Sequence, residues 1–136
     1  MAFMSDATVP LLTAADLIRW AGPVSVAGSC SACAELACPG WESLPGSFER
    51  SRLRRVGTLR RAEDEEPTYQ EHHPAGTHGW SVGAPIAPAY FPYNRCDVWQ
   101  CVACERAFLR YTEYGGYYVD ERIRALDPAL IDDTPL

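Results

Sequence analysis

The sequence contains no lysine and no long run of apolar residues. All 12 basic residues are arginines, and 18 acidic residues outnumber them, which gives a formal net charge of −6. A chain with this charge is not expected to bind DNA or an anionic membrane through general electrostatic attraction. No stretch reaches the roughly 18 apolar residues that a membrane span needs.

The start of the sequence also lacks positive charge. No basic residue precedes Arg19, whereas a signal peptide begins with one or more basic residues. We therefore expect a cytoplasmic protein without a membrane partner. The use of arginine alone is the expected result of a GC-rich bacterial genome, so it is not interpreted as a functional feature.

Four of the six cysteines form two widely separated Cys-x2-Cys pairs, Cys30 with Cys33 and Cys101 with Cys104. A Cys-x2-Cys turn directs both sulfurs to one centre, and two such turns supply four thiolates in tetrahedral geometry. In a reducing cytoplasm, paired cysteines favour metal binding over disulfides. We predict a structural Zn²⁺ site at these four residues, with iron in a rubredoxin-like site as the second candidate.

These two pairs resemble the knuckles of zinc-ribbon proteins, in which two hairpin turns share one zinc ion. The resemblance covers the two pairs and the strands just after them. It implies a bound metal and a zinc-ribbon-like arrangement around it, without implying a particular activity. Knuckles of this family usually carry glycine after the second cysteine, where φ is positive. Ala34 and Glu105 occupy these two positions here.

Cys38 and Cys96 extend the two pairs symmetrically, each separated by four residues from the nearer pair. Three interpretations remain open. Both can be buried thiols near the site, since a free cysteine behaves as a small apolar residue. They can join a histidine in a second metal site, or they can form a disulfide or replace one of the four chosen ligands.

All three histidines lie in one short segment: His72, His73 and His78. They support an alternative function, a zinc-dependent hydrolase in which a histidine joins the cysteines at an open site and Glu71 acts as general base. His73 is the preferred additional ligand. The sequence has no His-Glu-x-x-His motif, phosphate loop or nucleophile motif, so enzymatic activity is not assigned.

The sequence is long enough for one domain with its own core. Its patterns predict an α+β fold that is mainly antiparallel β, with zinc-ribbon-like knuckles and a short N-terminal helix. Thr13 and Asp16 are placed to cap this helix, and Gly22 ends it. We divide the single domain, residues 1–136, as follows: a helix at 12–22, a first knuckle at 24–34, an insert at 35–95, and a second knuckle with a hairpin at 96–124.

The hairpin is predicted from two alternating segments, 108–114 and 117–123, on either side of Gly115-Gly116. A two-residue turn would place Arg110 opposite Glu121, where opposite charges stabilise the strand pair. The same hairpin carries four tyrosines that form a candidate partner surface: Tyr111, Tyr114, Tyr117 and Tyr118.

Half of the arginines lie in residues 48–61, directly before the acidic run 63–66. We interpret 48–61 as a polar strand whose charges are neutralised across a hairpin, and RNA binding through residues 50–61 is the alternative. The function expected from the whole sequence is a non-enzymatic zinc-binding protein with a structural four-cysteine site. Its partner is expected to be another protein.

Overall fold

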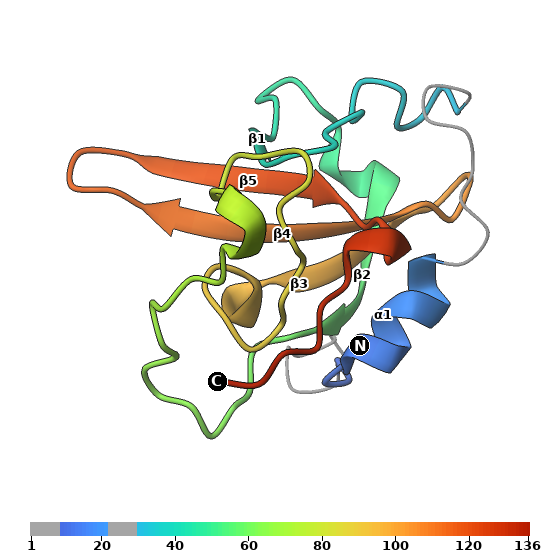
Figure 1. The fold of residues 1–136 in the computed structure, drawn as a ribbon. Coiled ribbons are helices and arrows are strands. Elements are labelled where there is room, and N and C mark those ends of the chain that lie inside the picture. Colours follow the sequence, from blue (N-terminus) through green and yellow to red (C-terminus); the bar gives the residue numbers. More distant parts are fainter. Residues whose placement is uncertain (1–8, 22–29) are drawn as a thin grey trace.

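The computed structural model describes residues 9–21 and 30–136, and it contains one helix and a five-stranded sheet (Figure 1). Neighbouring strands pair antiparallel in the order β1-β5-β4-β3-β2. This confirms the expected α+β class with mainly β content. The first part of the knuckle predicted at 24–34 lies outside the described residues. The elements are α1 Ala14–Ala21, β1 Glu42–Ser43, β2 Leu53–Thr58, β3 Asp97–Cys101, β4 Ala107–Tyr114 and β5 Val119–Ala125, with 3₁₀ turns at Arg50–Arg52, Pro74–Gly76, Tyr93–Arg95 and Pro128–Leu130.

Helix α1 begins at the predicted cap and lies within the predicted range 12–22. The Thr13 hydroxyl accepts a hydrogen bond from the Asp16 N–H at 3.2 Å, and the Asp16 carboxylate accepts one from the Thr13 N–H at 2.9 Å. This reciprocal pair satisfies N–H groups at the start of the helix that have no partner in the helix itself. Within the two described ranges, no helix combines the length and the apolar content needed to cross a bilayer.

The β4–β5 hairpin forms as predicted, but its register differs by two residues. Tyr114 lies opposite Val119 and Arg110 opposite Ile123, so the turn holds residues 115–118 instead of two glycines. The Tyr118 ring lies 2.1 Å from where a Cβ on Gly115 would be, so a larger residue there would force this half-exposed ring to move. A shift of two residues keeps each side chain on its predicted face.

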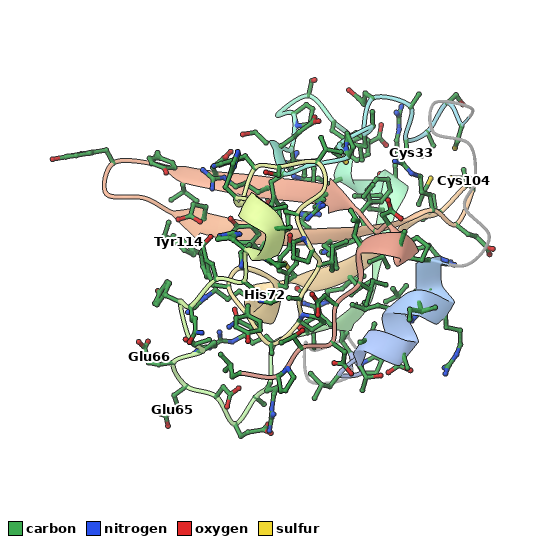
Figure 2. The ribbon with its side chains drawn as sticks, in the orientation of Figure 1. Cys33, Glu65, Glu66, His72, Cys104 and Tyr114 are labelled. Carbon is green, nitrogen blue, oxygen red and sulfur yellow. The ribbon has the colours of Figure 1, made fainter. Side chains whose placement is uncertain are left out.

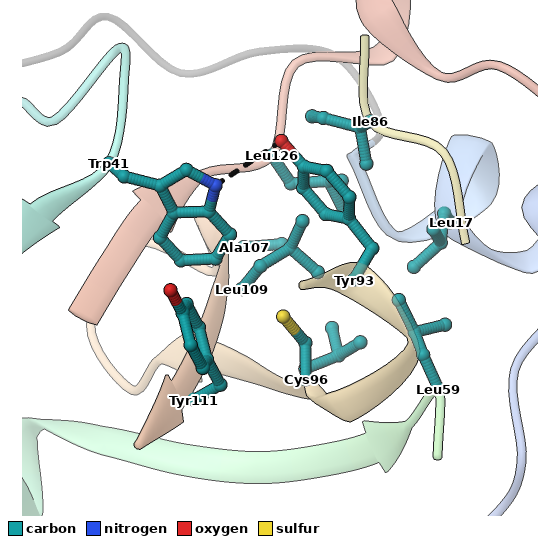
Figure 3. Packing of buried hydrophobic residues seen from close by; sticks show 11 residues of the cluster. Leu17, Trp41, Leu59, Ile86, Tyr93, Cys96, Ala107, Leu109, Tyr111 and Leu126 are labelled. Atoms are coloured by element: carbon teal, nitrogen blue, oxygen red, sulfur yellow. Dashed lines mark hydrogen bonds between the residues drawn. The ribbon is translucent and has the colours of Figure 1, made fainter. Parts of the chain in front are cut away.

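Alternate residues of β4 enter two different apolar clusters, so both faces of the central sheet are covered. Ala107 and Leu109 belong to the first cluster, which also holds Leu17 of α1 (Figure 3). Within it, the Trp41 indole N–H donates to the Tyr93 hydroxyl at 3.2 Å. The second cluster, on the other face, packs around Phe108 and contains three cysteines: Cys33, Cys38 and Cys101. The first Cys-x2-Cys turn is therefore anchored in a buried sheet face.

Arg124 of β5 is the largest completely buried side chain among the described residues. Its guanidinium donates to the Tyr93 hydroxyl and to the backbone carbonyls of Pro39, Val82 and Ala84. These bonds join β5 to two separate loops of the long insert. Nothing in the sequence distinguishes this arginine from the others, because its partners are backbone atoms far away in the chain.

The arginines of 48–61 have partners in several parts of the structure. Strand β2 forms as predicted, but it pairs with β3 and not with the acidic run, so the prediction of a neutralising hairpin was wrong. Arg55 binds Asp97 of β3 at 3.1 Å. Arg61 does form an ion pair with the acidic run, since its Nη2 lies 2.7 Å from the Glu63 carboxylate. Strand pairing therefore decides the partner of Arg55, whereas Arg61 pairs with a carboxylate only two residues away.

Candidate metal centre

The four cysteines of the two Cys-x2-Cys pairs come together in space. Their Sγ atoms all lie within 4.8 Å of one another, and Cys33 and Cys104 are seen near each other in Figure 2. The Cys33–Cys104 sulfur distance is 3.6 Å, and the Cys30–Cys101 distance is 3.9 Å. Four sulfurs at about 2.3 Å from zinc form a tetrahedron with edges of about 3.8 Å. The spacing therefore fits one four-coordinate metal ion and is consistent with a zinc-ribbon-like site.

The turn between β3 and β4 supplies the second pair. Cys101 ends β3 and is completely buried. The turn is closed by the Glu105 N–H, which donates to the Cys101 carbonyl, and by the Cys101 N–H, which donates to the Arg106 carbonyl, both at 2.9 Å. Glu105 has a φ of 69°, the left-handed conformation that favours glycine. The second turn therefore adopts the backbone of a knuckle although glutamate stands at the glycine position.

The first pair lies in a turn outside the sheet. The Cys33 N–H donates to the Cys30 carbonyl at 3.2 Å, and the Leu36 N–H donates to the Cys33 carbonyl at 2.9 Å. Ala34 is not among the described residues with positive φ, whereas Cys38 has a φ of 23°. The two turns therefore bring their sulfurs to one cluster from different backbone conformations.

Replacing Glu105 by glycine is expected to stabilise the protein by about 0.5–1 kcal/mol. A left-handed conformation costs a non-glycine residue about 1–2 kcal/mol, and the freedom of glycine in the unfolded chain offsets about 0.5–1 kcal/mol of the gain. Ala34→Gly is the matched control and is expected to destabilise, because the equivalent residue of the first turn has no positive φ. Urea unfolding of the two metal-loaded variants measures both changes in the free energy of unfolding. Equal changes in the two variants would contradict the inference that the left-handed conformation of Glu105 costs stability.

Two arginines hold the first turn against the rest of the site through backbone carbonyls. Arg106 donates to the Leu36 carbonyl at 2.7 Å and to the Ala37 carbonyl at 3.1 Å, while Arg52 donates to the Ala32 carbonyl at 3.4 Å. A divalent ion with four thiolates carries a net charge of about −2. Both cations would therefore stabilise such a metal-loaded centre electrostatically. No motif in the sequence identifies them.

The sulfurs differ in their affinity for protons when no metal is bound. The backbone N–H of Ala32 lowers the pKa of Cys30 to about 7, against the opposing effect of desolvation. Burial raises the pKa of Cys33 and of Cys104. A metal ion must therefore displace protons from these thiols, and metal affinity is expected to fall as the pH falls.

Cys38 and Cys96 are buried thiols outside the four-sulfur group. The Cys38 thiol donates to the Leu36 carbonyl and the Cys96 thiol to the Pro92 carbonyl, both at 3.4 Å. All six cysteines are free, so a disulfide between this pair is excluded, and neither replaces one of the four chosen ligands. Burial raises the pKa of both thiols, to about 12 for Cys38.

The raised pKa of Cys38 predicts a loss of stability at alkaline pH. An unfolded cysteine ionises near pH 8.5, whereas the folded chain keeps this thiol protonated until about pH 12. Above about pH 8.5 the folded state therefore binds more protons, and the free energy of unfolding falls as the pH rises. From pH 8 to pH 9.5 the wild type is expected to lose about 1 kcal/mol more than Cys38→Ala. Denaturant titrations test this, and parallel pH profiles would refute it.

The three histidines considered as alternative ligands lie outside the four-sulfur group: His72, His73 and His78. His72 Nε2 is 3.0 Å from the Asp132 carboxylate, and Figure 2 shows it well away from Cys33 and Cys104. His73 Nε2 is 2.6 Å from the Glu71 carboxylate. Among the described residues, the four cysteines are the only cluster of three or more potential ligands. The structure therefore brings neither His73 nor the suggested general base Glu71 to the sulfurs.

Three of the four tyrosines chosen as a partner surface are exposed at the end of the hairpin: Tyr114, Tyr117 and Tyr118. Tyr111 was wrongly included. Its side chain is buried edge-on against Trp41, with 4.9 Å between ring centroids, and its hydroxyl donates to Glu113 at 3.1 Å. It faces the first apolar cluster, because side chains alternate along β4.

Comparisons of the chain with protein-family models, curated proteins and solved structures found no match. The site is therefore characterised by its geometry. Four sulfurs from two distant turns could hold one metal ion in a structural site.

Proposed function

We propose that this chain is a non-enzymatic zinc-binding protein whose four-cysteine site is structural and whose function is to bind another protein. The main observation that supports this proposal is that all four Sγ atoms lie within 4.8 Å of one another. Four thiolates fill the coordination positions of a tetrahedral ion, so no position is left for water or substrate. Closed sites of this kind stabilise a fold and do not activate a nucleophile.

Zinc is preferred to iron as the bound ion, and metal analysis of the purified protein distinguishes them. The protein is expected to be colourless and to contain about one zinc per chain, as a single tetrahedral site requires. A red protein that contains iron would contradict the zinc assignment. It would support a rubredoxin-like centre instead.

The support for a protein partner comes from the end of the β4–β5 hairpin, which projects beyond the other strands (Figure 1). Tyr114, Tyr118 and Val119 are 75 %, 53 % and 66 % exposed, and Tyr117 is fully exposed. Large apolar side chains gathered on one projecting segment are typical of protein-interaction sites. Tyrosine is also enriched in such interfaces, because its ring is apolar and its hydroxyl is polar.

Affinity capture from cell lysate tests this surface. The variant Tyr114→Ala/Tyr117→Ala is expected to lose a partner that the wild type recovers. The matched control is Ile18→Ala/Val82→Ala, which removes apolar side chains of 53 % and 60 % exposure elsewhere and should keep that partner. Metal content must be equal in all three proteins. Equal recovery of every captured protein by the tyrosine variant would rule out the hairpin as the contact.

A further inference from the structure

A pocket of about 380 Å³ lies beside β4, away from the cysteines. β3 begins at Asp97, opposite Arg110, so β4 continues beyond the end of its neighbour. Side chains of the insert line this part of the sheet, among them Tyr69 and Arg95. The volume falls within the range of small-molecule sites.

The pocket wall holds as many arginines as acidic residues, but two of its arginines are not paired with a carboxylate of the described residues. Each acidic side chain of the wall is paired with an arginine: Asp97 with Arg55 at 3.1 Å, Glu113 with Arg122 at 3.6 Å, and Glu121 with Arg110 at 3.0 Å. Two further arginines of the wall, Arg60 and Arg95, donate to backbone carbonyls. Over the described parts of the chain, neither of them has a carboxylate at ion-pair distance. The wall can therefore accept an anion without breaking an existing pair.

Two buried guanidinium nitrogens of the wall have no acceptor in the protein, Nε of Arg95 and Nη1 of Arg110. Only one other buried side-chain polar atom in the described residues is without a partner, Oδ1 of Asn94. Buried donors are nearly always hydrogen-bonded, and guanidinium groups form their strongest bonds with carboxylates and phosphates. These two nitrogens are shielded from solvent, so an anionic ligand in the pocket would meet the exposed Arg60 guanidinium and the remaining nitrogens of Arg95.

Aromatic rings accompany the arginines. The Arg95 guanidinium lies 4.1 Å from the centroid of Tyr69, and that of Arg110 lies 4.3 Å from the centroid of Trp99. Tyr69 is 66 % exposed, so its ring is accessible to a flat ligand. Aromatic and guanidinium planes both stack on planar rings. The combination selects a ligand that has a planar ring as well as an anionic group.

We propose that this pocket binds a small anionic ligand with a planar ring, of the nucleoside monophosphate class. Arg60 and Arg95 contact the phosphate, and Tyr69 stacks on the base. A single phosphate group interacts mainly with the arginines beside it, so the net charge of the whole protein matters little for its binding. A long polyanion would extend over a protein whose net charge is −6 and would be repelled. This ligand site is independent of the bound metal, and it adjoins the hairpin surface, because Tyr114 also lines the pocket.

Calorimetric titration of the metal-loaded full chain tests the proposal with five kinds of probe. These are the four ribonucleoside 5′-monophosphates, the corresponding nucleosides, inorganic phosphate, an aromatic-free sugar phosphate and a single-stranded oligoribonucleotide. At least one nucleotide is expected to bind at least tenfold more tightly than its nucleoside and than phosphate, because both parts contribute. Arg95→Gln and Arg60→Gln should each weaken nucleotide binding roughly tenfold or more. Tyr69→Ala should weaken the nucleotide and the nucleoside alike.

Arg19→Gln is the control, since Arg19 is an exposed arginine of α1 and does not line the pocket; it should bind as the wild type does. Arg60 is exposed, so Arg60→Gln keeps the test valid if Arg95→Gln fails to fold. Absence of binding by all four nucleotides would overturn the proposal. So would unchanged nucleotide affinity in the folded Arg60→Gln variant, or binding of the oligoribonucleotide alone.

Discussion

Cys101→Ser is expected to abolish stoichiometric metal binding and to lower the free energy of unfolding by at least about 5 kcal/mol. Cys101 is completely buried at the end of β3, with its sulfur 3.9 Å from that of Cys30. Binding of structural zinc contributes about 10–16 kcal/mol in small peptides, and whole domains are stable by only about 5–15 kcal/mol. Loss of one thiolate therefore removes much of the net stability.

Metal content and thermal unfolding measure this effect, and the expected fall in Tm is at least about 15 °C. Cys38→Ala is the matched control, because Cys38 is buried in the same apolar cluster but lies outside the four-sulfur group. It should keep its metal and lose about 1 kcal/mol. Retention of a full metal equivalent and of the wild-type Tm by Cys101→Ser would refute the ligand assignment.

Arg124→Met is expected to lower the free energy of unfolding by about 3–5 kcal/mol without removing the metal. Methionine fills a similar volume, but it leaves without a donor the three carbonyls that Arg124 binds, Pro39, Val82 and Ala84. Each buried acceptor that loses its partner costs about 1–3 kcal/mol. The expected loss of stability is smaller than the sum of these three costs, because the variant no longer has to desolvate a buried guanidinium group.

Two further variants separate shape from charge at this position. Arg124→Lys keeps the charge but cannot reach four acceptors in different directions, so it should lose nearly as much stability as Arg124→Met. Arg19→Met is the surface control; its ion pair with Asp16 is 3.4 Å long and largely exposed, and it should change stability by less than about 1 kcal/mol. A stable Arg124→Met protein, unfolding within about 1 kcal/mol of the wild type, would show that the buried network contributes little.

The local parts of the fold could be predicted because the interactions that form them are local. The cap of α1 depends on Thr13 and Asp16, three residues apart, and both hydrogen bonds form. Alternation of side chains similarly placed the β4–β5 hairpin. The prediction of the exact register failed because the register depends on the turn, which holds the four residues 115–118 instead of two glycines.

The cysteine site was predictable for a different reason. The chemistry of a tetrahedral ion requires four ligands, and two Cys-x2-Cys pairs supply them whatever the separation in sequence. The same argument could not decide the places of Cys38 and Cys96. Only the folded chain shows their exclusion from the site: Cys96 lies in the other apolar cluster, and the Cys38 thiol, although it shares a cluster with Cys33 and Cys101, donates to the Leu36 carbonyl. The burial of Tyr111 against Trp41 also follows from packing.

By itself, the sequence predicted the four candidate ligands, the class of fold and the positions of its helix and hairpin, because these depend on spacing and alternation over a few residues. The tertiary structure alone decided the partners of the arginines that bind distant backbone carbonyls. Arg106 binds backbone carbonyls directly after the first cysteine turn. Arg124 joins the insert to the sheet, also through backbone carbonyls, which any residue could provide. Every residue has a backbone carbonyl, so the sequence cannot indicate which carbonyls accept hydrogen bonds from an arginine. Only the folded chain shows which arginine each of them binds.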